Sequence, residues 1–253
     1  MVEILEPSRQ LAPQDVEREL QALAERYRRA GRSGVKVANL LGAQAENLLD
    51  RLPGPVRDGL GRATEQGLTL AVEAAGHSRR AVPDQPVWVN TAMSSVMGAA
   101  GGFSGLPGTL VELPMTITLL MRAVQGVAVQ HGFDPSADSV KFDCVRVFSS
   151  GGPLSHDDAD DLAFIAIRVS LGGAAMQKMI ATIAPRLAAV LGQKLAAQSI
   201  PVLGAVTGAA VNYVYTDYYQ QLADVHFGLR RLAIDADRSH EELVEGLRLY
   251  LQA

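Results

Sequence analysis

Apolar side chains recur at helical spacing along most of the chain. The first such stretch covers residues 15–30 and places five apolar side chains on one helix face: Val16, Leu20, Leu23, Tyr27 and Ala30. Arginines mixed with glutamates fall on the opposite face, which is typical of a solvated surface, although a basic amphipathic helix can also lie on an anionic bilayer. Gly31 and Gly34 are predicted to end this helix.

Two more helices are predicted before the middle of the chain. The second covers about residues 35–51 and is stopped by Pro53-Gly54-Pro55. The third covers about 55–75 and carries a narrow stripe of small residues, which predicts that another helix approaches it closely. Residues 76–86 are polar and bounded by proline, so they form the predicted internal linker.

The fold is predicted to be organised around residues 85–121, a stretch that is almost uncharged. Glu112 is its only formal charge, and a Gly-Leu-Pro-Gly break at 105–108 divides it. Glycines four residues apart in 87–105 favour close contact between helix backbones. These features predict a central Gly-rich helical hairpin.

Two segments raise the question of membrane insertion. Residues 87–129 are diluted by Gly, Ala, Ser and Thr, and they contain Arg122, which is costly in hydrocarbon unless it is paired. Residues 195–216 carry no formal charge but include polar side chains such as Asn212. The sequence leaves open whether either segment enters a bilayer.

The C-terminal part of the chain also reads as helical. A helix at 137–149 is predicted to be capped by Ser136 or Asp138. Ser239 opens a capping-box pattern before a last helix at 240–251.

An acidic cluster follows Ser155 and could suggest a metal site. Its members, beside His156, are Asp157, Asp158, Asp160 and Asp161. Acids in the first turn of a helix complement the helix dipole, and no second set of spaced ligands is visible, so we predict no metal. Further along, Pro185 is predicted to start a new helical turn.

The composition agrees with a helical architecture. Hydrophobic residues make up 48% of the 253 residues and aromatic residues only 5%, and the β-branched residues do not alternate as they do in strands. We therefore predict an all-α, single-domain multi-helix bundle with the Gly-rich hairpin at its centre. Within it, residues 1–80 are predicted to form amphipathic helices that pack as an extension on a core of residues 81–253.

Charge and cysteine content narrow the function classes. A net charge of −4 without a basic groove argues against nucleic-acid binding. Cys144 is the only cysteine and is predicted to be a buried thiol, so neither an internal disulfide nor a thiolate metal cluster can form within the chain. The first ten residues do not resemble a secretory signal, which favours a cytoplasmic protein. No cofactor is indicated.

A few polar side chains stand in apolar surroundings and form the candidate site. Glu112 is foremost, because a buried carboxylate must find a cation or take up a proton. The cations nearest in sequence are Arg122, Lys141 and Arg146, so a structural ion pair and a general acid or base are both open readings. Asn212 is predicted to hydrogen-bond across helices.

Four blocks of the sequence resemble the EcsC family of bacterial proteins. They are GLPGTLVELPMTITLLMRAV, VFSSGGP, IPVLGAVTGAAVNY and HFGLRRL, and the resemblance spans roughly residues 85–235. It implies association with membranes, since the family's namesake is encoded with an ABC-type transporter, and it carries no agreed catalytic mechanism. The polar positions of the family fall here on Glu112, Arg122, Asn212, His226 and Arg230.

Two classes of function follow. The first is a non-enzymatic cytoplasmic protein, peripheral at the inner face of the membrane, that binds a lipid or hydrophobic small molecule and is accessory to a membrane transporter. The second is a hydrolase acting on a membrane-derived substrate through Glu112, His226 and Arg230, which must then converge in one cleft.

Overall fold

The structure is a computed structural model, and it describes most of the chain. The described residues are 4–5, 10–41, 48–81, 106–150, 152–153, 173–198 and 204–252. They form seven α-helices and one short 3-10 helix, and no strand occurs among them beyond an isolated bridge between Ile4 and Phe133. The prediction of an all-α fold is therefore confirmed.

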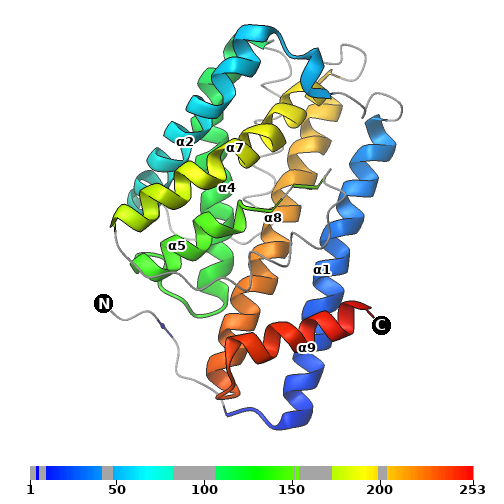
Figure 1. The fold of residues 1–253 in the computed structure, drawn as a ribbon, viewed down its shortest axis with the longest axis vertical. Coiled ribbons are helices and arrows are strands. Elements are labelled where there is room, and N and C mark those ends of the chain that lie inside the picture. The colour runs from blue at the N-terminus through cyan, green and yellow to red at the C-terminus, as the bar shows by residue number, and fades with distance from the viewer. Residues whose placement is uncertain are drawn as a thin grey trace.

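The helices are long and most of them run along the length of the bundle (Figure 1). Their bounds are α1 Pro13–Leu41, α2 Gly54–Ala81, α4 Leu106–Gln130, α5 Asp138–Val147, α7 Gly173–Gln198, α8 Gly204–Asp235 and α9 His240–Gln252, with the 3-10 helix η2 at Leu48–Arg51.

Helix α8 connects the two sides of the bundle. It contacts α1 and α9 on one side and α4, α5 and α7 on the other, while α2 packs against α4 and α7. The reason lies in its sequence, because its large side chains are buried on more than one face: Val211, Tyr215, Tyr219, Leu222, Val225 and Leu229. A helix that is apolar on several faces is stable only when other helices surround it.

One continuous core joins the N-terminal helices to the rest. Leu20 of α1 and Leu68 of α2 belong to the same buried cluster as the aromatic side chains of α8. Within that cluster the rings of Phe148 and Tyr219 meet edge to face with centroids 5.0 Å apart. The first 80 residues thus share the main core, and their treatment as a separate extension stays a prediction.

The close approach predicted for the third helix is observed. A Cβ built on Gly67 of α2 would lie 3.3 Å from the Cα of Pro114 in α4. A side chain at this position would also lie 2.6 Å from Cδ1 of Ile117, so both that side chain and the Pro114 backbone would have to shift. The small-residue stripe therefore sets the distance between α2 and α4.

Three predicted helix boundaries are wrong. Helix α1 continues through Gly31 and Gly34 to Leu41, because a glycine inside a helix costs only about 1 kcal/mol. Pro185 does not start a helix but lies inside α7, where its side chain is exposed. The predicted linker is partly helical, since α2 extends to Ala81.

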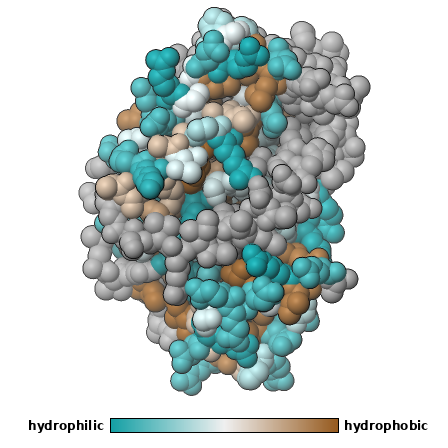
Figure 2. Space-filling model, viewed as in Figure 1, coloured by the Kyte–Doolittle hydropathy of each residue, from teal (hydrophilic) through white to brown (hydrophobic). Residues whose placement is uncertain are grey.

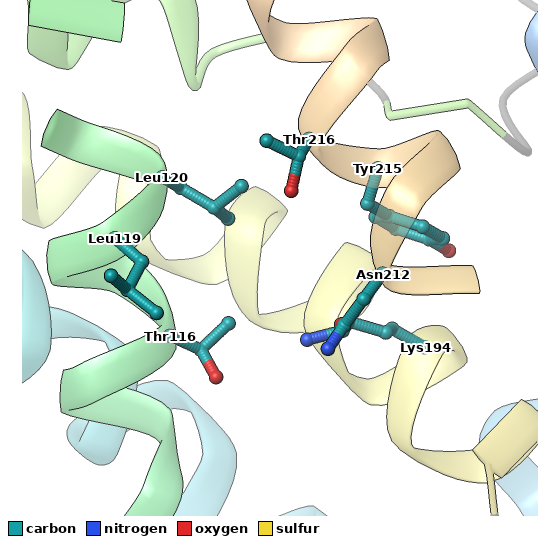
Figure 3. A pocket seen from close by; sticks show the side chains of 7 residues that line it. All are labelled: Thr116, Leu119, Leu120, Lys194, Asn212, Tyr215 and Thr216. Carbon is teal, nitrogen blue, oxygen red and sulfur yellow. The ribbon is translucent and has the colours of Figure 1, made fainter. Parts of the chain in front are cut away.

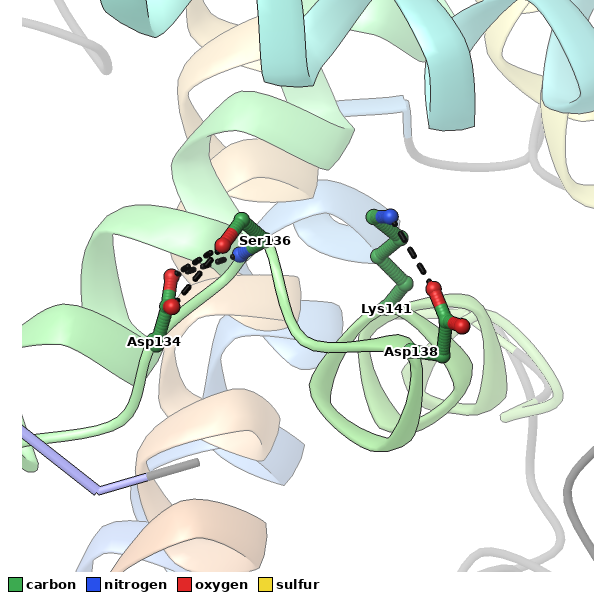
Figure 4. Close-up of polar contacts among 4 residues, drawn as sticks. All are labelled: Asp134, Ser136, Asp138 and Lys141. Carbon is green, nitrogen blue, oxygen red and sulfur yellow. Dashed lines mark hydrogen bonds and ion pairs between the residues drawn. The ribbon is translucent and has the colours of Figure 1, made fainter. Parts of the chain in front are cut away.

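The predicted caps have mixed outcomes. Ser239 caps α9 as expected, because its Oγ accepts a hydrogen bond from the backbone N–H of Glu242 at 3.2 Å. No side chain caps α5. Figure 4 shows why: the backbone N–H and Oγ of Ser136 both donate to the carboxylate of Asp134 (2.8 and 2.7 Å), and Asp138 pairs with Lys141.

Other predictions fall outside the described residues. They include helix 87–105 of the Gly-rich hairpin and the acidic cluster at 157–161. Cys144 is a buried thiol outside any disulfide, as predicted. None of the described helices is long and apolar enough to cross a membrane. The described surface on the face in Figure 2 is mostly hydrophilic with small hydrophobic patches.

Candidate functional site

A buried ion cluster joins α5 to α8. Its centre is Asp143, whose carboxylate oxygens lie 2.5 Å from Nη1 of Arg230, 3.3 Å from Nε2 of His226 and 3.6 Å from Nη1 of Arg146. His226 and Arg230 occur one turn apart on α8, and Arg146 occurs one turn after Asp143 on α5. Helical spacing therefore brings all four side chains together.

Burial lowers the pKa of both arginines in this cluster. Burial lowers the pKa of Arg230 to about 10. Burial also lowers the pKa of Arg146, while the nearby Asp143 carboxylate raises it. With a pKa of about 10 the Arg230 guanidinium keeps its charge at neutral pH, and it lies 4.8 Å from the centre of the Phe133 ring. The cluster is built to hold two helices together.

A second ion cluster joins α8 to α1 and to the end of α4. Asp224 accepts from Nη1 of Arg26 and pairs with Nε2 of His131, both at 2.6 Å. These side chains are partly exposed, so solvent screens the attraction. Among the described residues, no group of three or more His, Cys, Asp or Glu side chains could hold a metal ion.

A small cleft lies between α4, α7 and α8 (Figure 3). Its lining residues are Thr116, Leu119, Leu120, Lys194, Asn212, Tyr215 and Thr216. Lys194 and Asn212 project from α7 and α8 on one side, and Leu119 and Leu120 project from α4 on the other. The interior has room for about one water molecule and is partly open to solvent.

Tyr215 is buried beside this cleft. Its side chain is 1% exposed, and its hydroxyl has no hydrogen-bond partner among the described residues. Burial raises the pKa of the Tyr215 phenol well above its usual range. An unpartnered buried hydroxyl adds nothing to stability at neutral pH.

Tyr215→Phe tests this description. At pH 7 the free energy of unfolding is expected to stay the same or rise by about 1 kcal/mol, because the unpaired hydroxyl is removed. In the unfolded chain the Tyr215 phenol ionises near pH 10, whereas burial keeps it protonated to higher pH in the folded protein. The free energy of unfolding of the parent therefore falls as the pH rises above 10. Between pH 10 and 12 the free energy of unfolding, measured by urea titration, is expected to fall less for the variant than for the parent.

Two comparisons complete that test. Tyr213→Phe removes a hydroxyl from an exposed ring on the same helix and controls for the substitution itself. The lowered pKa of Arg230 makes the free energy of unfolding rise with pH above 10, which is the opposite trend. This contribution is the same in parent and variant, so it cancels in the comparison. A Tyr215→Phe protein that is destabilised by more than 1 kcal/mol at pH 7 contradicts the unpaired hydroxyl.

The predicted site residues do not gather in one place. His226 and Arg230 meet at Asp143, whereas Asn212 lies in the cleft, 14 residues earlier on α8 and thus about 21 Å along the helix axis. Lys141 pairs with Asp138 at the surface (3.1 Å), and Arg122 is half-buried on α4. The side chain of Glu112 lies outside the described residues.

Sequence reasoning missed two central residues. Asp143 lies in the apolar run KFDCVRVF, and Lys194 is the only formal charge in residues 187–216. A charged residue inside an apolar helical pattern was the signal that could have identified each of them. Asp143 meets Arg230, which is 87 positions away, and Lys194 shares the cleft with residues of two other helices, so the pattern alone does not bring them together.

The described residues thus define an α-helical bundle with a buried ion cluster and a small polar-lined cleft. The sequence model of the EcsC protein family matches residues 84–232. Since this match covers more than half of the chain, the protein belongs to the EcsC family. Both the Asp143 cluster and the cleft lie within the matched region. No curated protein and no solved structure matches the chain.

Proposed function

We propose that this protein is a non-enzymatic binder of a lipid or another hydrophobic ligand, peripheral at the inner face of the membrane. The observation that carries the proposal is the cleft between α4, α7 and α8, where Leu119 and Leu120 face Lys194 and Asn212. Ligand sites typically combine an apolar wall with a few polar groups that fix the orientation of the ligand. An amphipathic molecule suits such a lining.

The lining favours binding over catalysis. Of its seven residues, only Lys194 and Tyr215 can titrate, and the remainder are Leu, Thr and Asn side chains. The hydrolase alternative requires Glu112, His226 and Arg230 to converge on a substrate. His226 and Arg230 instead both contact the carboxylate of Asp143.

Exposed apolar side chains support contact with a membrane surface. Leu70 of α2 is 53% exposed and Met115 of α4 is 56% exposed. They occur close to Gly67 and Pro114, where these two helices touch. Such side chains can enter the headgroup boundary of a bilayer. An accessory role beside a membrane transporter is part of the same proposal, because the family's namesake is encoded with one.

Two measurements test the proposal. Mass spectrometry of the natively purified protein is expected to detect a co-purifying lipid or amphiphile. Liposome flotation is expected to recover the protein, and Leu70→Ser with Met115→Ser is expected to reduce that recovery. Leu249→Ser, which changes a similarly exposed leucine on α9, serves as the control. Failure to float with every lipid mixture, anionic ones included, together with no bound amphiphile, removes the proposal.

A further inference from the structure

We infer that the ligand site extends out of the cleft onto the adjoining surface, where Met115 of α4 and Tyr213 of α8 hold the apolar chain of a single-chain amphiphile. This inference rests on the proposed function and deepens it, because it names the class of ligand and the side chains that contact its chain. The cleft itself then receives only the end of the ligand.

The cleft is too small to enclose a lipid. Its interior has room for about one water molecule, whereas pockets that enclose a small-molecule ligand usually measure about 300 to 1,000 Å³. An amphiphile that enters the cleft therefore leaves most of its length outside. Because a chain that stays in water gains no binding free energy, a ligand of this class requires apolar side chains beside the opening.

On α4 the cleft opens towards Met115. Among the lining residues of this helix, Leu120 is buried, whereas Thr116 and Leu119 are half-buried. Met115 is 56% exposed. At about 100° per residue it lies about 40° beyond Leu119, on the side away from Leu120. Met115 therefore continues the wall of the cleft onto the surface.

On α8 the cleft opens towards Tyr213. Asn212 and Thr216 line the cleft and are buried, whereas Tyr213 is 52% exposed. Around the helix Tyr213 lies about 60° beyond Thr216, which places it at the edge of the cleft. A tyrosine ring offers a large apolar area there and keeps its hydroxyl in water.

The helices α4 and α8 run in the same direction beside the cleft. In Figure 3, Leu120 lies above Thr116 on α4. Thr216 likewise lies above Asn212 on α8. Helix α7, which contributes Lys194 to the lining, lies behind both of them in this view.

Met115 and Tyr213 lie on the same side of the cleft. Met115 lies about a quarter turn back from the lining face of α4, and Tyr213 lies about a quarter turn forward of the lining face of α8. When two parallel right-handed helices face each other, a turn back from one face and a turn forward from the other lead to the same side. That side is opposite α7, so the two exposed side chains flank one opening.

The width between the two side chains suits a single hydrocarbon chain. Axes of packed helices are about 8 to 10 Å apart, and α4 and α8 are in contact. A helix of a partner protein is about 10 to 12 Å across with its side chains, so it does not fit between the two rims. Of the five large apolar side chains that are exposed among the described residues, Met115 and Tyr213 are the two on these helices.

A series of ligands of different length tests the inference first. Affinity is measured for octanoate, decanoate and laurate, each below the concentration at which it aggregates, with the 253-residue chain after removal of bound lipid. Affinity is expected to rise about 4- to 15-fold for each two methylene groups added, because each is covered by apolar side chains. Affinity that does not depend on chain length overturns the inference.

Substitutions then assign the effect to the two side chains. Met115→Ser and Tyr213→Ser are each expected to weaken the binding of laurate about 3- to 15-fold, whereas Tyr213→Phe keeps the ring and the affinity. Leu70→Ser removes a similarly exposed side chain from α2, away from the cleft, and is expected to leave the affinity unchanged. An equal loss in Leu70→Ser overturns the inference.

Methyl NMR of methionine-labelled protein gives a readout that needs no substitution. Saturating laurate is expected to shift the Met115 methyl signal and to leave that of Met121, which is buried in the core on the same helix, nearly unchanged. Laurate that binds without shifting Met115 overturns the inference and leaves the proposed function in place. If no amphiphile binds and none co-purifies, the proposed function fails and the inference fails with it.

Discussion

Asp143→Asn is expected to lower the free energy of unfolding by about 3 to 5 kcal/mol, the usual cost of removing one partner from a buried ion pair. Arg230 is 2.5 Å from Asp143, and the side chains of both are less than one fifth exposed. Without the carboxylate, two guanidinium groups remain close together in a poorly solvated place. His226, whose side chain is 3% exposed, also loses its charged neighbour.

Urea unfolding at pH 7 measures this effect, and Asp138→Asn provides the control. Asp138 also lies on α5 and also pairs with a cation, but its side chain is 87% exposed. Surface pairs contribute about 0 to 1 kcal/mol, so the control is expected to unfold almost as the parent does. Similar losses in both variants would show that the Asp143 cluster does not hold α5 against α8.

Gly152→Ala is expected to destabilise the protein by about 2 to 4 kcal/mol. Gly152 has a φ of +79°, which an alanine adopts only with strain. A Cβ at this position would also lie 2.6 and 2.9 Å from the two methyl groups of Val190 in α7. Rotation of this β-branched side chain cannot move both methyl groups away.

Two further variants separate these causes. Gly61→Ala lies inside α2 and meets nothing within 4 Å, so it is expected to stabilise the protein by about 0.5 to 1 kcal/mol. Adding Val190→Ala to Gly152→Ala removes the clash but not the backbone strain, so the double variant is expected to lose less than the sum of the two single losses. Strict additivity would contradict the contact with Val190.

The sequence pattern predicted most of the helices because a helix face, a cap and a small-residue stripe each depend on residues a few positions apart. The amphipathic face of Leu20 and Leu23, the Ser239 cap and the small-residue contact at Gly67 all follow from neighbours within a few positions. The helix breaks were less predictable. Gly31 and Pro185 disfavour a helix by a few kcal/mol at most, and the packing of a long helix against its neighbours outweighs that cost.

The site was harder to predict because it depends on which helices are neighbours. Asp143 meets Arg230, which is 87 positions away. Lys194, Asn212 and Thr116 share a cleft although they come from three helices. Periodicity shows which face of a helix is buried but not which helix covers it. A pair such as His226 and Arg230 was found because both lie on one helix, one turn apart.

Helix α8 carries both features that matter for the proposal. The part near its C-terminal end holds His226 and Arg230 against α5, and its earlier turns place Asn212 and Thr216 at the cleft. The ion cluster thus fixes one end of the helix that forms a wall of the cleft.

Methyl NMR of leucine-labelled protein, during titration with palmitate, tests the location of the ligand most directly. The account predicts saturable shifts of the Leu119 and Leu120 methyl signals, which line the cleft, and little change at Leu23 and Leu247 in the core near α1 and α9. Unchanged Leu119 and Leu120 signals at saturating palmitate, or equal shifts at all four leucines, would contradict it.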